Sequence, residues 1–309
     1  MTSCKLSKVL PSCLSFVLKR KKALHFNNRN FGRKMTDGSN HLERTAESGR
    51  NNITSLATVI GLRQESTTVK SLRLKIHDER LTFKAGQWVD MFMPEVDIVG
   101  GFSMYSSPEQ LQREGTIDLA VKYSTHPPAL WVHTKCNEGT KVYIRVGGDI
   151  YYDPGVSEPC HDLLLIAGGI GINPLLSILC HVRDLITLKK KGNLECDKLI
   201  PQKVLLLYSA AKQDELIFKN QIEKIVFSND EVKCIFYVTQ AESSNGLKAG
   251  RIGKDDIKES FNWLKEHQTK TYICGPSPMI TNMEKLLIDQ GLDEKTILYE
   301  KWWIPAETA

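Results

Sequence analysis

Strand-type patterns dominate the chain from residue 53 to 155. Its apolar residues there are β-branched or alternate with polar ones, and Gly, Pro, Asp or charged turns separate the segments. Regularly spaced short strands of this kind predict a small antiparallel β-barrel. The expected strands are 56–64, 69–76, 87–93, 116–124 and 141–146.

One helix is expected inside the barrel region. It would open at Pro127-Pro128, because proline suits the first turn of a helix, and Gly139 would follow its end as a stop signal. A helix that opens in this way would present N-terminal amides, which are a place for a phosphate.

From residue 160 to 309 short apolar runs alternate with helical patterns. Such alternation predicts a doubly wound, parallel five-stranded sheet with right-handed crossovers. The expected strands are 163–168, 203–209, 234–239, 271–275 and 296–303. Ligands of such sheets bind at the carboxyl ends of the strands. One cleft should therefore collect the strand ends at Gly168–Gly171, Ser209–Lys212, Thr239–Gln240 and Cys274–Pro276.

A glycine-rich turn joins the first of these strands to its helix. The turn contains Gly168, Gly169, Ile170, Gly171, Ile172, Asn173 and Pro174. Glycines let the backbone turn sharply and lie close to a ligand, because no Cβ blocks the approach. The first amides of the helix that follows would form, with its dipole, a pocket for a pyrophosphate. A tight strand-to-helix turn without a ligand is the alternative.

The first 36 residues carry nine Lys or Arg residues and no acid, with serines interspersed. This composition is typical of a mitochondrial presequence, and a secretory signal or a plain tail are the alternatives. Residues 37–52 are polar and are expected to be a linker to the barrel at 53–155 and the second domain at 160–309. No segment is expected to reach the length of a membrane span.

Charge and cysteine spacing exclude several kinds of partner. Without the basic first 36 residues, 32 basic residues face 36 acidic ones, which argues against nucleic acid. The eight cysteines include no C-x-x-C pair, and no chelating His pair occurs, so no metal is predicted. Several cysteines lie in apolar runs and are expected to be reduced and buried. Cys274 is the exception, at a strand end.

Three motifs in order carry a family resemblance. The segments GGIGINP, LLYSAAKQDELIF and ICGPSPM follow a barrel, and the chain from 53 to 303 thereby resembles the ferredoxin–NADP reductase superfamily. It is most similar to the cytochrome b5 reductase-like and flavohaemoprotein-like branches. The resemblance implies an FAD-type barrel followed by an NAD-binding domain, with NAD(H) and FAD as cofactors.

The resemblance also assigns roles at the nucleotide side. It implies that the glycine turn holds the pyrophosphate, and that Cys274, with Gly275 and Pro276, lies beside the nicotinamide C4 from which hydride leaves. A structural cysteine is the alternative. Members that use NADPH place a Ser and an Arg at the end of the second strand. This chain has Ser209 without the arginine, so NADH is the expected donor.

At the flavin side the chain departs from the family pattern. The family motif R-x-Y-S corresponds to Gly100-Gly101-Phe102-Ser103, so the resemblance implies that Phe102 stacks on the flavin and Ser103 hydrogen-bonds it. The arginine that would hold the flavin pyrophosphate is missing, and a charge-assisted bond of that kind contributes about 1.5–3 kcal/mol. The second phosphate motif is replaced by His126-Pro127-Pro128.

Two functions follow from this sequence. In the first, the protein is an NADH-dependent flavoprotein oxidoreductase in which hydride passes from NADH to a flavin, with Cys274 and Ser103 at the reacting centre. Electrons then pass to a separate acceptor of unknown identity. In the second, it is a non-catalytic NAD-binding module whose flavin site is eroded. Fold resemblance alone does not choose between them.

Overall fold

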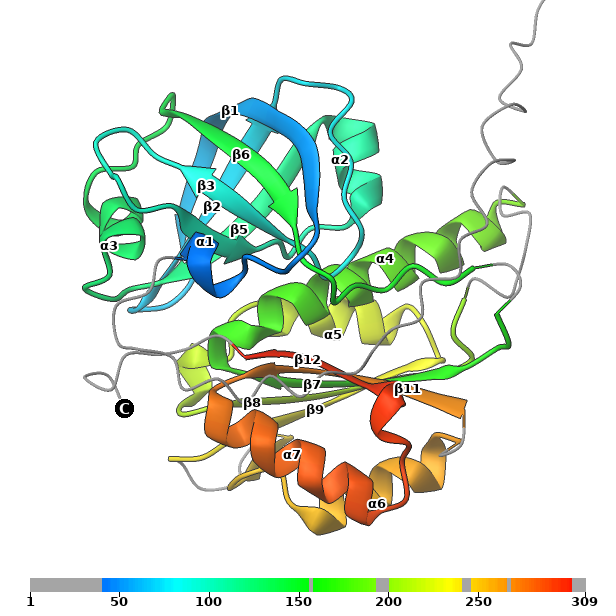
Figure 1. Cartoon of the computed structure of the whole chain (residues 1–309). Helices are drawn as coiled ribbons and strands as arrows, with labels where there is room; N and C mark the ends of the chain where they lie inside the picture. Colours follow the sequence, from blue (N-terminus) through cyan, green and yellow to red (C-terminus); the bar gives the residue numbers. More distant parts are fainter. Residues whose placement is uncertain (1–40, 156–157, 193–199, 241–245, 266–267, 302–309) are drawn as a thin grey trace, which may run out of the picture. The chain divides into compact units, whose positions relative to one another are not determined.

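The computed structural model describes residues 41–155, 158–192, 200–240, 246–265 and 268–301. The expected presequence at 1–36 lies outside this part of the chain. Within the described residues two six-stranded sheets form the body, one antiparallel and one parallel (Figure 1).

The antiparallel sheet is the predicted barrel. Its strand order is β4-β3-β6-β1-β2-β5, and a bridge between Met104 and Leu119 joins its two edges and nearly closes it. Alternate residues of these strands point inward and pack into one apolar core. The strands are β1 (Arg50–Gln64), β2 (Val69–Ile76), β3 (Trp88–Phe92), β4 (Gly100–Ser103), β5 (Thr116–Lys122) and β6 (Lys141–Gly147). The barrel also carries α2 (Pro108–Glu114) and α3 (Pro127–Thr134), and the latter is the helix expected after the two prolines.

The segment just before the barrel is not the linker that its polar composition suggested. Residues His41–Arg44 form a short helix, α1, and β1 begins at Arg50, where it pairs with Gly147. His41 is only 2% exposed, so this segment packs on the barrel. A single buried side chain in four helical residues has no periodicity that sequence inspection could detect.

The parallel sheet has the order β10-β9-β8-β7-β11-β12. Its strands are β7 (Asp162–Gly168), β8 (Val204–Ala210), β9 (Val232–Val238), β10 (Leu247–Ala249), β11 (Thr269–Gly275) and β12 (Ile297–Lys301). The order reverses on either side of β7, as expected for a doubly wound sheet. The prediction had five strands, and β10 is the sixth. Three residues are too few to show a strand pattern in the sequence.

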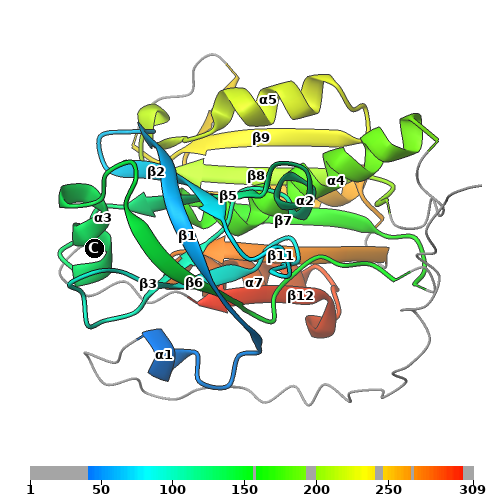
Figure 2. The same ribbon diagram turned by 90° about the horizontal axis from the view of Figure 1, so that it is seen from above.

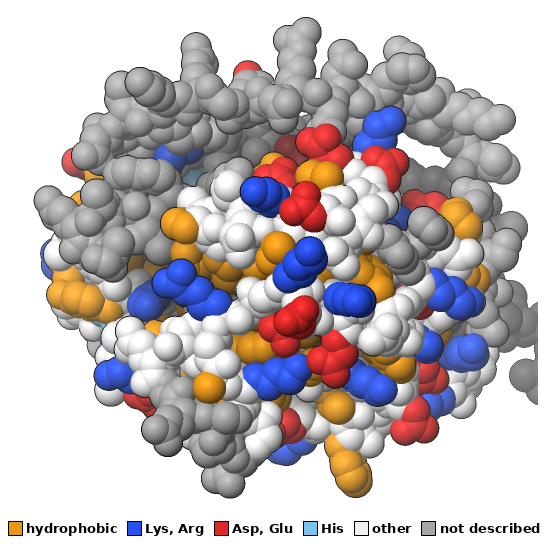
Figure 3. Space-filling model, turned by 90° about the horizontal axis from the view of Figure 1, so that it is seen from below, with side chains coloured by type: hydrophobic (Ala, Val, Ile, Leu, Met, Phe, Trp, Pro, Cys, Tyr) orange, Lys and Arg blue, Asp and Glu red, His pale blue; other side chains and the backbone are white. Residues whose placement is uncertain are grey.

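Helices cover both faces of this sheet. On one face lie α4 (Ile172–Lys190) and α5 (Lys219–Phe227), of which α4 is between the sheet and the barrel, and on the other lie α6 (Lys254–Trp263) and α7 (Ser277–Asp289) (Figures 1 and 2). On the face seen in Figure 3, basic and acidic side chains are interspersed and form no patch of one sign.

No segment is expected from the sequence to be as long as a membrane span, but one helical stretch reaches that length. The helical stretch Gly169–Lys190 is long and apolar enough to cross a membrane, with a mean hydropathy of 1.2 over its most apolar window. However, 78% of that window is buried inside the protein. Its composition is therefore accounted for by its place between the sheet and the barrel, where both sides of the helix are covered.

Hydrogen bonds from α4 hold the barrel against the parallel sheet. The Ser177 hydroxyl donates to the Ser106 carbonyl at 2.7 Å and accepts from the Gly86 amide at 3.3 Å. The Asn173 Nδ2 donates to the Ala120 carbonyl at 2.8 Å. All of these bonds are buried, so they fix how the first turns of α4 meet the edge of the barrel.

Candidate functional site

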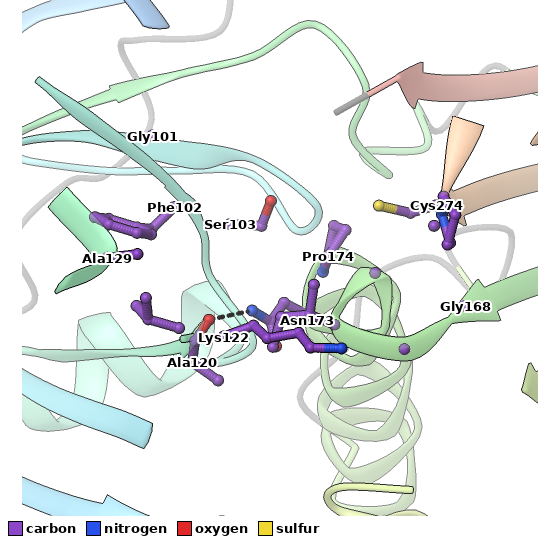
Figure 4. A pocket seen from close by; sticks show the side chains of 16 residues that line it. Gly101, Phe102, Ser103, Ala120, Lys122, Ala129, Gly168, Asn173, Pro174 and Cys274 are labelled. Atoms are coloured by element: carbon purple, nitrogen blue, oxygen red, sulfur yellow. Dashed lines mark hydrogen bonds between the residues drawn. The ribbon is translucent and has the colours of Figure 1, made fainter. Parts of the chain in front are cut away.

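A cleft of about 290 Å³ lies where the barrel meets the carboxyl ends of the parallel strands (Figure 4). On the barrel side the cleft is lined by strand β4, the end of β5 and the helix α3. On the side of the parallel sheet it is lined by the glycine turn and the end of β11. Its lining residues are Gly101, Phe102, Ser103, Ala120, Val121, Lys122, Ala129, Gly168, Gly169, Ile170, Gly171, Asn173, Pro174, Cys274, Gly275 and Pro276.

The glycines of the turn are required for different reasons. Gly169 has φ +52°, and no atom lies within 4 Å of the place where a Cβ would be, so its backbone borders open space in the cleft. Gly171 has φ −62°, which any residue adopts. A Cβ there would lie 2.3 Å from the Cys274 carbonyl oxygen, so Gly171 is needed for packing. The open space beside Gly169 is the part of the turn that fits a pyrophosphate.

The helix after the turn begins at Ile172, preceded by a 3-10 turn over Gly169–Gly171. This is slightly earlier than the expected start near Asn173. The Asn173 side chain is 3% exposed and uses its Nδ2 for the bond to the barrel, while its Oδ1 is buried with no hydrogen-bond partner. A buried acceptor without a partner is costly, so this oxygen can accept a hydrogen bond from a ligand in the cleft.

The end of β11 forms the opposite wall. Cys274 pairs in register with Ala167 of β7, and Figure 4 shows its sulfur directed into the cleft. A Cβ on Gly275 would lie 3.1 Å from the Gly168 Cα, so this position needs glycine for the two strand ends to pack. Pro276 precedes the first turn of α7. Cys136 and Cys180 are buried thiols as expected, and Cys274 is buried as well, whereas Cys160 and Cys234 are partly exposed.

The other two strand ends do not line this cleft. In the sheet, Ser209 pairs with Gly168 on one side and Tyr237 on the other, so β8 and β9 end at the same edge. Neither Ser209–Lys212 nor Thr239–Gln240 belongs to the lining residues. The register brings all four strand ends to the same edge of the sheet, but only the ends of β7 and β11 line the cleft. Lys212 is exposed at that edge.

On the barrel side, Ser103 and Phe102 are both at the cleft. Figure 4 shows the Ser103 hydroxyl facing the open space, and the Phe102 ring beside Ala129 of α3. A Cβ on Gly100 would lie 2.5 Å from the Phe102 Cε2 and 3.0 Å from the Pro128 Cβ. The phenyl ring therefore occupies the space that a side chain at position 100 would need.

The start of α3 is a poorer phosphate site than its two prolines suggested. Pro127 and Pro128 occupy its first two positions, and proline has no N–H. The amide of Leu130 already donates to the His126 carbonyl at 3.0 Å. Ala129 alone remains as an amide donor in the first turn, so this helix start, like Gly100, does not fit the pyrophosphate arm of FAD.

A buried ion cluster behind β4 was not anticipated from the sequence. Asp90 is fully buried, and Arg50 Nε and Arg145 Nη2 donate to its Oδ2 at 2.9 and 2.7 Å. His41 Nε2 lies 3.0 Å from Asp90 Oδ1, and the His41 ring packs on Gly101. Burial alone would raise the pKa of Asp90, but these partners outweigh it and lower the pKa to about 2. The sequence feature that could have indicated this cluster is an aspartate within the apolar strand WVDMF.

Metal chemistry finds no support among the side chains that the structure describes. No group of three or more His, Cys, Asp or Glu residues in that part of the chain is arranged to hold an ion. The absence of a metal stays a prediction for the chain as a whole.

Comparisons with known proteins agree with this architecture. Residues 165–285 match the family model described as "Oxidoreductase NAD-binding domain". The "Oxidoreductase NAD-binding domain-containing protein 1" of Danio rerio is 45% identical over 278 residues, which are 88% of this chain and 99% of that protein.

Solved structures show the same fold at low identity. The flavohem-like FAD/NAD-binding domain of a nitric oxide dioxygenase from Vibrio cholerae aligns with a TM-score of 0.64 at 20% identity, covering 80% of this chain and 98% of that one. A ferredoxin–NADP+ reductase from Neisseria gonorrhoeae with bound FAD and NADP aligns with a TM-score of 0.65 at 17% identity, covering 82% and 100%. The chain thus has the ferredoxin reductase fold and belongs to the oxidoreductase NAD-binding domain-containing protein 1 family.

Proposed function

We propose that this protein is an NADH-dependent flavoprotein oxidoreductase. One observation carries the proposal: a single cleft is lined by Ser103 from the barrel and by Cys274 and the glycine turn from the parallel sheet. Two ligands bound on the two sides of that cleft would meet with their reacting rings in one space, and holding reactants in contact is the main requirement of hydride transfer.

Four residues of the cleft have distinct parts in this reaction. The backbone at Gly169 receives the pyrophosphate of NADH, and the Asn173 Oδ1 accepts a hydrogen bond from a ligand N–H group. The Cys274 thiol packs against the nicotinamide, and the Ser103 hydroxyl hydrogen-bonds the ring on the barrel side. A flavin bound there supplies an acceptor for hydride and passes electrons singly or in pairs. The acceptor of those electrons is a separate molecule.

A second candidate is favoured by the changes at Gly100 and at α3. Because the Phe102 ring and two prolines occupy the place of phosphate-binding groups, the protein could bind NADH and no flavin. It would then be a non-catalytic module that binds NAD(H).

The absorbance of the purified protein separates the two candidates. We expect absorbance at about 450 nm, characteristic of oxidised flavin, either as purified or after addition of FAD or FMN, and bleaching of that band by NADH without oxygen. A protein that binds NADH but stays colourless with both flavins would be the module. The variant Ser103→Ala should slow the bleaching while leaving the affinity for NADH unchanged.

The site of action is proposed to be the mitochondrion. This rests on the basic, acid-free composition of residues 1–36. Fusion of residues 1–36 to a fluorescent protein tests it: mitochondrial fluorescence is expected, and secretion of the fusion would identify a secretory signal instead.

A further inference from the structure

A groove of about 670 Å³ lies where strands β1 and β2 of the barrel meet the helices α2, α4 and α5. It shares no lining residue with the cleft described above, and it is the larger of the two. Three of the residues that line it are arginines, Arg63 of β1, Arg73 of β2 and Arg183 of α4. We call it the arginine groove.

The strand register places two of the arginines side by side. Between β1 and β2, Gly61 pairs with Arg73 and Arg63 pairs with Ser71. The two arginines are therefore diagonal neighbours on one face of the strand pair, about 7–8 Å apart, which long side chains can span. Gly61 has no side chain to fill the groove. The nearest atom to a Cβ built there is the Arg73 Cβ, at an ordinary contact distance of 3.6 Å.

Each arginine is held by a carboxylate that is more deeply buried than the arginine itself. The three carboxylate side chains are 8, 3 and 11% exposed, whereas the arginine side chains paired with them are 68, 49 and 36% exposed. The pairs are Arg63 with Glu65, Arg73 with Asp118 and Arg183 with Asp184. The charges balance in number, but a ligand that enters the groove meets the guanidinium groups before the carboxylates.

The ion pairs leave most of the guanidinium donors unused. Arginine has five N–H donors in a planar group. Arg73 uses two of them, because its Nε and Nη2 donate to Asp118 at 2.8 Å each. Arg63 and Arg183 likewise use Nε and Nη2 for their carboxylates, and within the described residues none of the three guanidinium groups makes another hydrogen bond. Each arginine therefore keeps three donors for an acceptor in the groove.

We propose that the arginine groove binds a small polyanion, a molecule with two or more phosphate or carboxylate groups. A guanidinium group bonds two oxygens of such an acid group at once, and three arginines from three elements match a ligand with several acid groups. The ligand would join the barrel to α4, because Arg63 and Arg73 belong to one and Arg183 to the other. This site is separate from the cleft, so its existence does not depend on the proposed function.

Calorimetric titrations of the full chain with inorganic pyrophosphate and with citrate test the site. We expect at least one of the two probes to bind with a Kd below about 1 mM. Binding of pyrophosphate alone would identify a phosphorylated ligand, and binding of citrate alone a carboxylate ligand.

Two substitutions should weaken that binding at least about fivefold. Arg63→Gln removes one guanidinium group, and Gly61→Val places a strand-compatible side chain in the groove at a position without a positive φ. Arg80→Gln is the matched control and should leave the affinity unchanged. Arg80 is paired with Asp78 through Nε and Nη2, as Arg63 is with Glu65, and does not line the groove.

Three results would overturn the proposal. The first is that neither probe binds the wild type, and the second is that Arg63→Gln binds as tightly as the wild type or loses no more than Arg80→Gln. The third is a loss of binding in Gly169→Val and not in Arg63→Gln, which would assign the anion to the glycine turn. Because the Arg63 side chain is 68% exposed, Arg63→Gln should fold even if Gly61→Val does not. An unchanged urea unfolding midpoint checks this.

Discussion

At the scale of single residues, the glycine turn separates a conformational requirement from a packing one. Gly169 needs its positive φ and borders open space, whereas Gly171 is confined by the backbone of Cys274. Substitution of the two glycines should therefore cause different defects, loss of ligand binding at Gly169 and loss of folding at Gly171.

Gly169→Val should abolish NADH binding with a moderate loss of stability. A β-branched residue at positive φ costs about 1–3 kcal/mol and places its methyl groups in the cleft. Gly139→Val is the matched control, because Gly139 also has a positive φ with no atom near its Cβ position and does not line the cleft. Calorimetric titration with NADH should show binding to Gly139→Val only. Equal binding by both variants would remove the turn from the nucleotide site.

Asp90 gives a prediction about pH. Its pKa is about 2 in the folded protein and 3.8 as the ordinary value, so the folded state is stabilised by about 2 kcal/mol above pH 4. This contribution decreases as the pH falls toward 2, because protonation then removes the carboxylate that the two arginines share. The destabilisation caused by Asp90→Asn should accordingly shrink by about 1 kcal/mol between pH 7 and pH 3.

Urea unfolding of both proteins at the two pH values measures this difference. Asp230→Asn, at an exposed aspartate, should show little destabilisation at either pH. If the loss of unfolding free energy caused by Asp90→Asn is the same at both pH values, the cluster acts through packing alone.

At the scale of elements, the residues at the carboxyl end of β8 lead us to predict a preference between the two nicotinamide nucleotides. Ser209, the residue before the last of this strand, lies next to Gly168, and Ala210, Ala211 and the exposed Lys212 follow. A 2′-phosphate needs paired donors to offset its desolvation, and one exposed lysine contributes only about 0.2–1 kcal/mol. We expect NADH to bind about tenfold more tightly than NADPH. Tighter binding of NADPH that disappears in Lys212→Ala would contradict this reading of the edge.

The elements also show what a sequence can reveal. The glycine turn, the strand–helix alternation and the helix at Pro127 are local patterns, and the structure has all three. The docking of α1 and the short strand β10 have no local pattern, because one buried histidine and three residues carry no periodicity. The Phe102 ring illustrates a third limit. A strand pattern gives the face of a side chain, whereas its packing over Gly100 depends on α3, which is 25 residues further along the chain.

At the scale of the whole molecule, the cleft exists only while the barrel and the parallel sheet keep their relative position. Its two sides come from different sheets, and α4 contacts both. Loss of a contact between α4 and the barrel should therefore affect electron transfer without changing the nucleotide-binding turn itself.

Ser177 is the residue that tests this dependence. It lies outside the cleft lining, is fully buried, and links α4 to both Ser106 and Gly86 of the barrel. Ser177→Ala leaves a buried carbonyl and a buried amide without their partner, which costs about 1–3 kcal/mol. Ser260→Ala is the matched control, because the buried Ser260 hydroxyl bonds Asp256 within its own helix α6. Anaerobic mixing of the flavin-loaded protein with NADH should show slower bleaching for Ser177→Ala only, at an unchanged affinity for NADH. An unchanged rate would mean that the remaining contacts, such as the Asn173 bond to Ala120, suffice to hold the two sides of the cleft together.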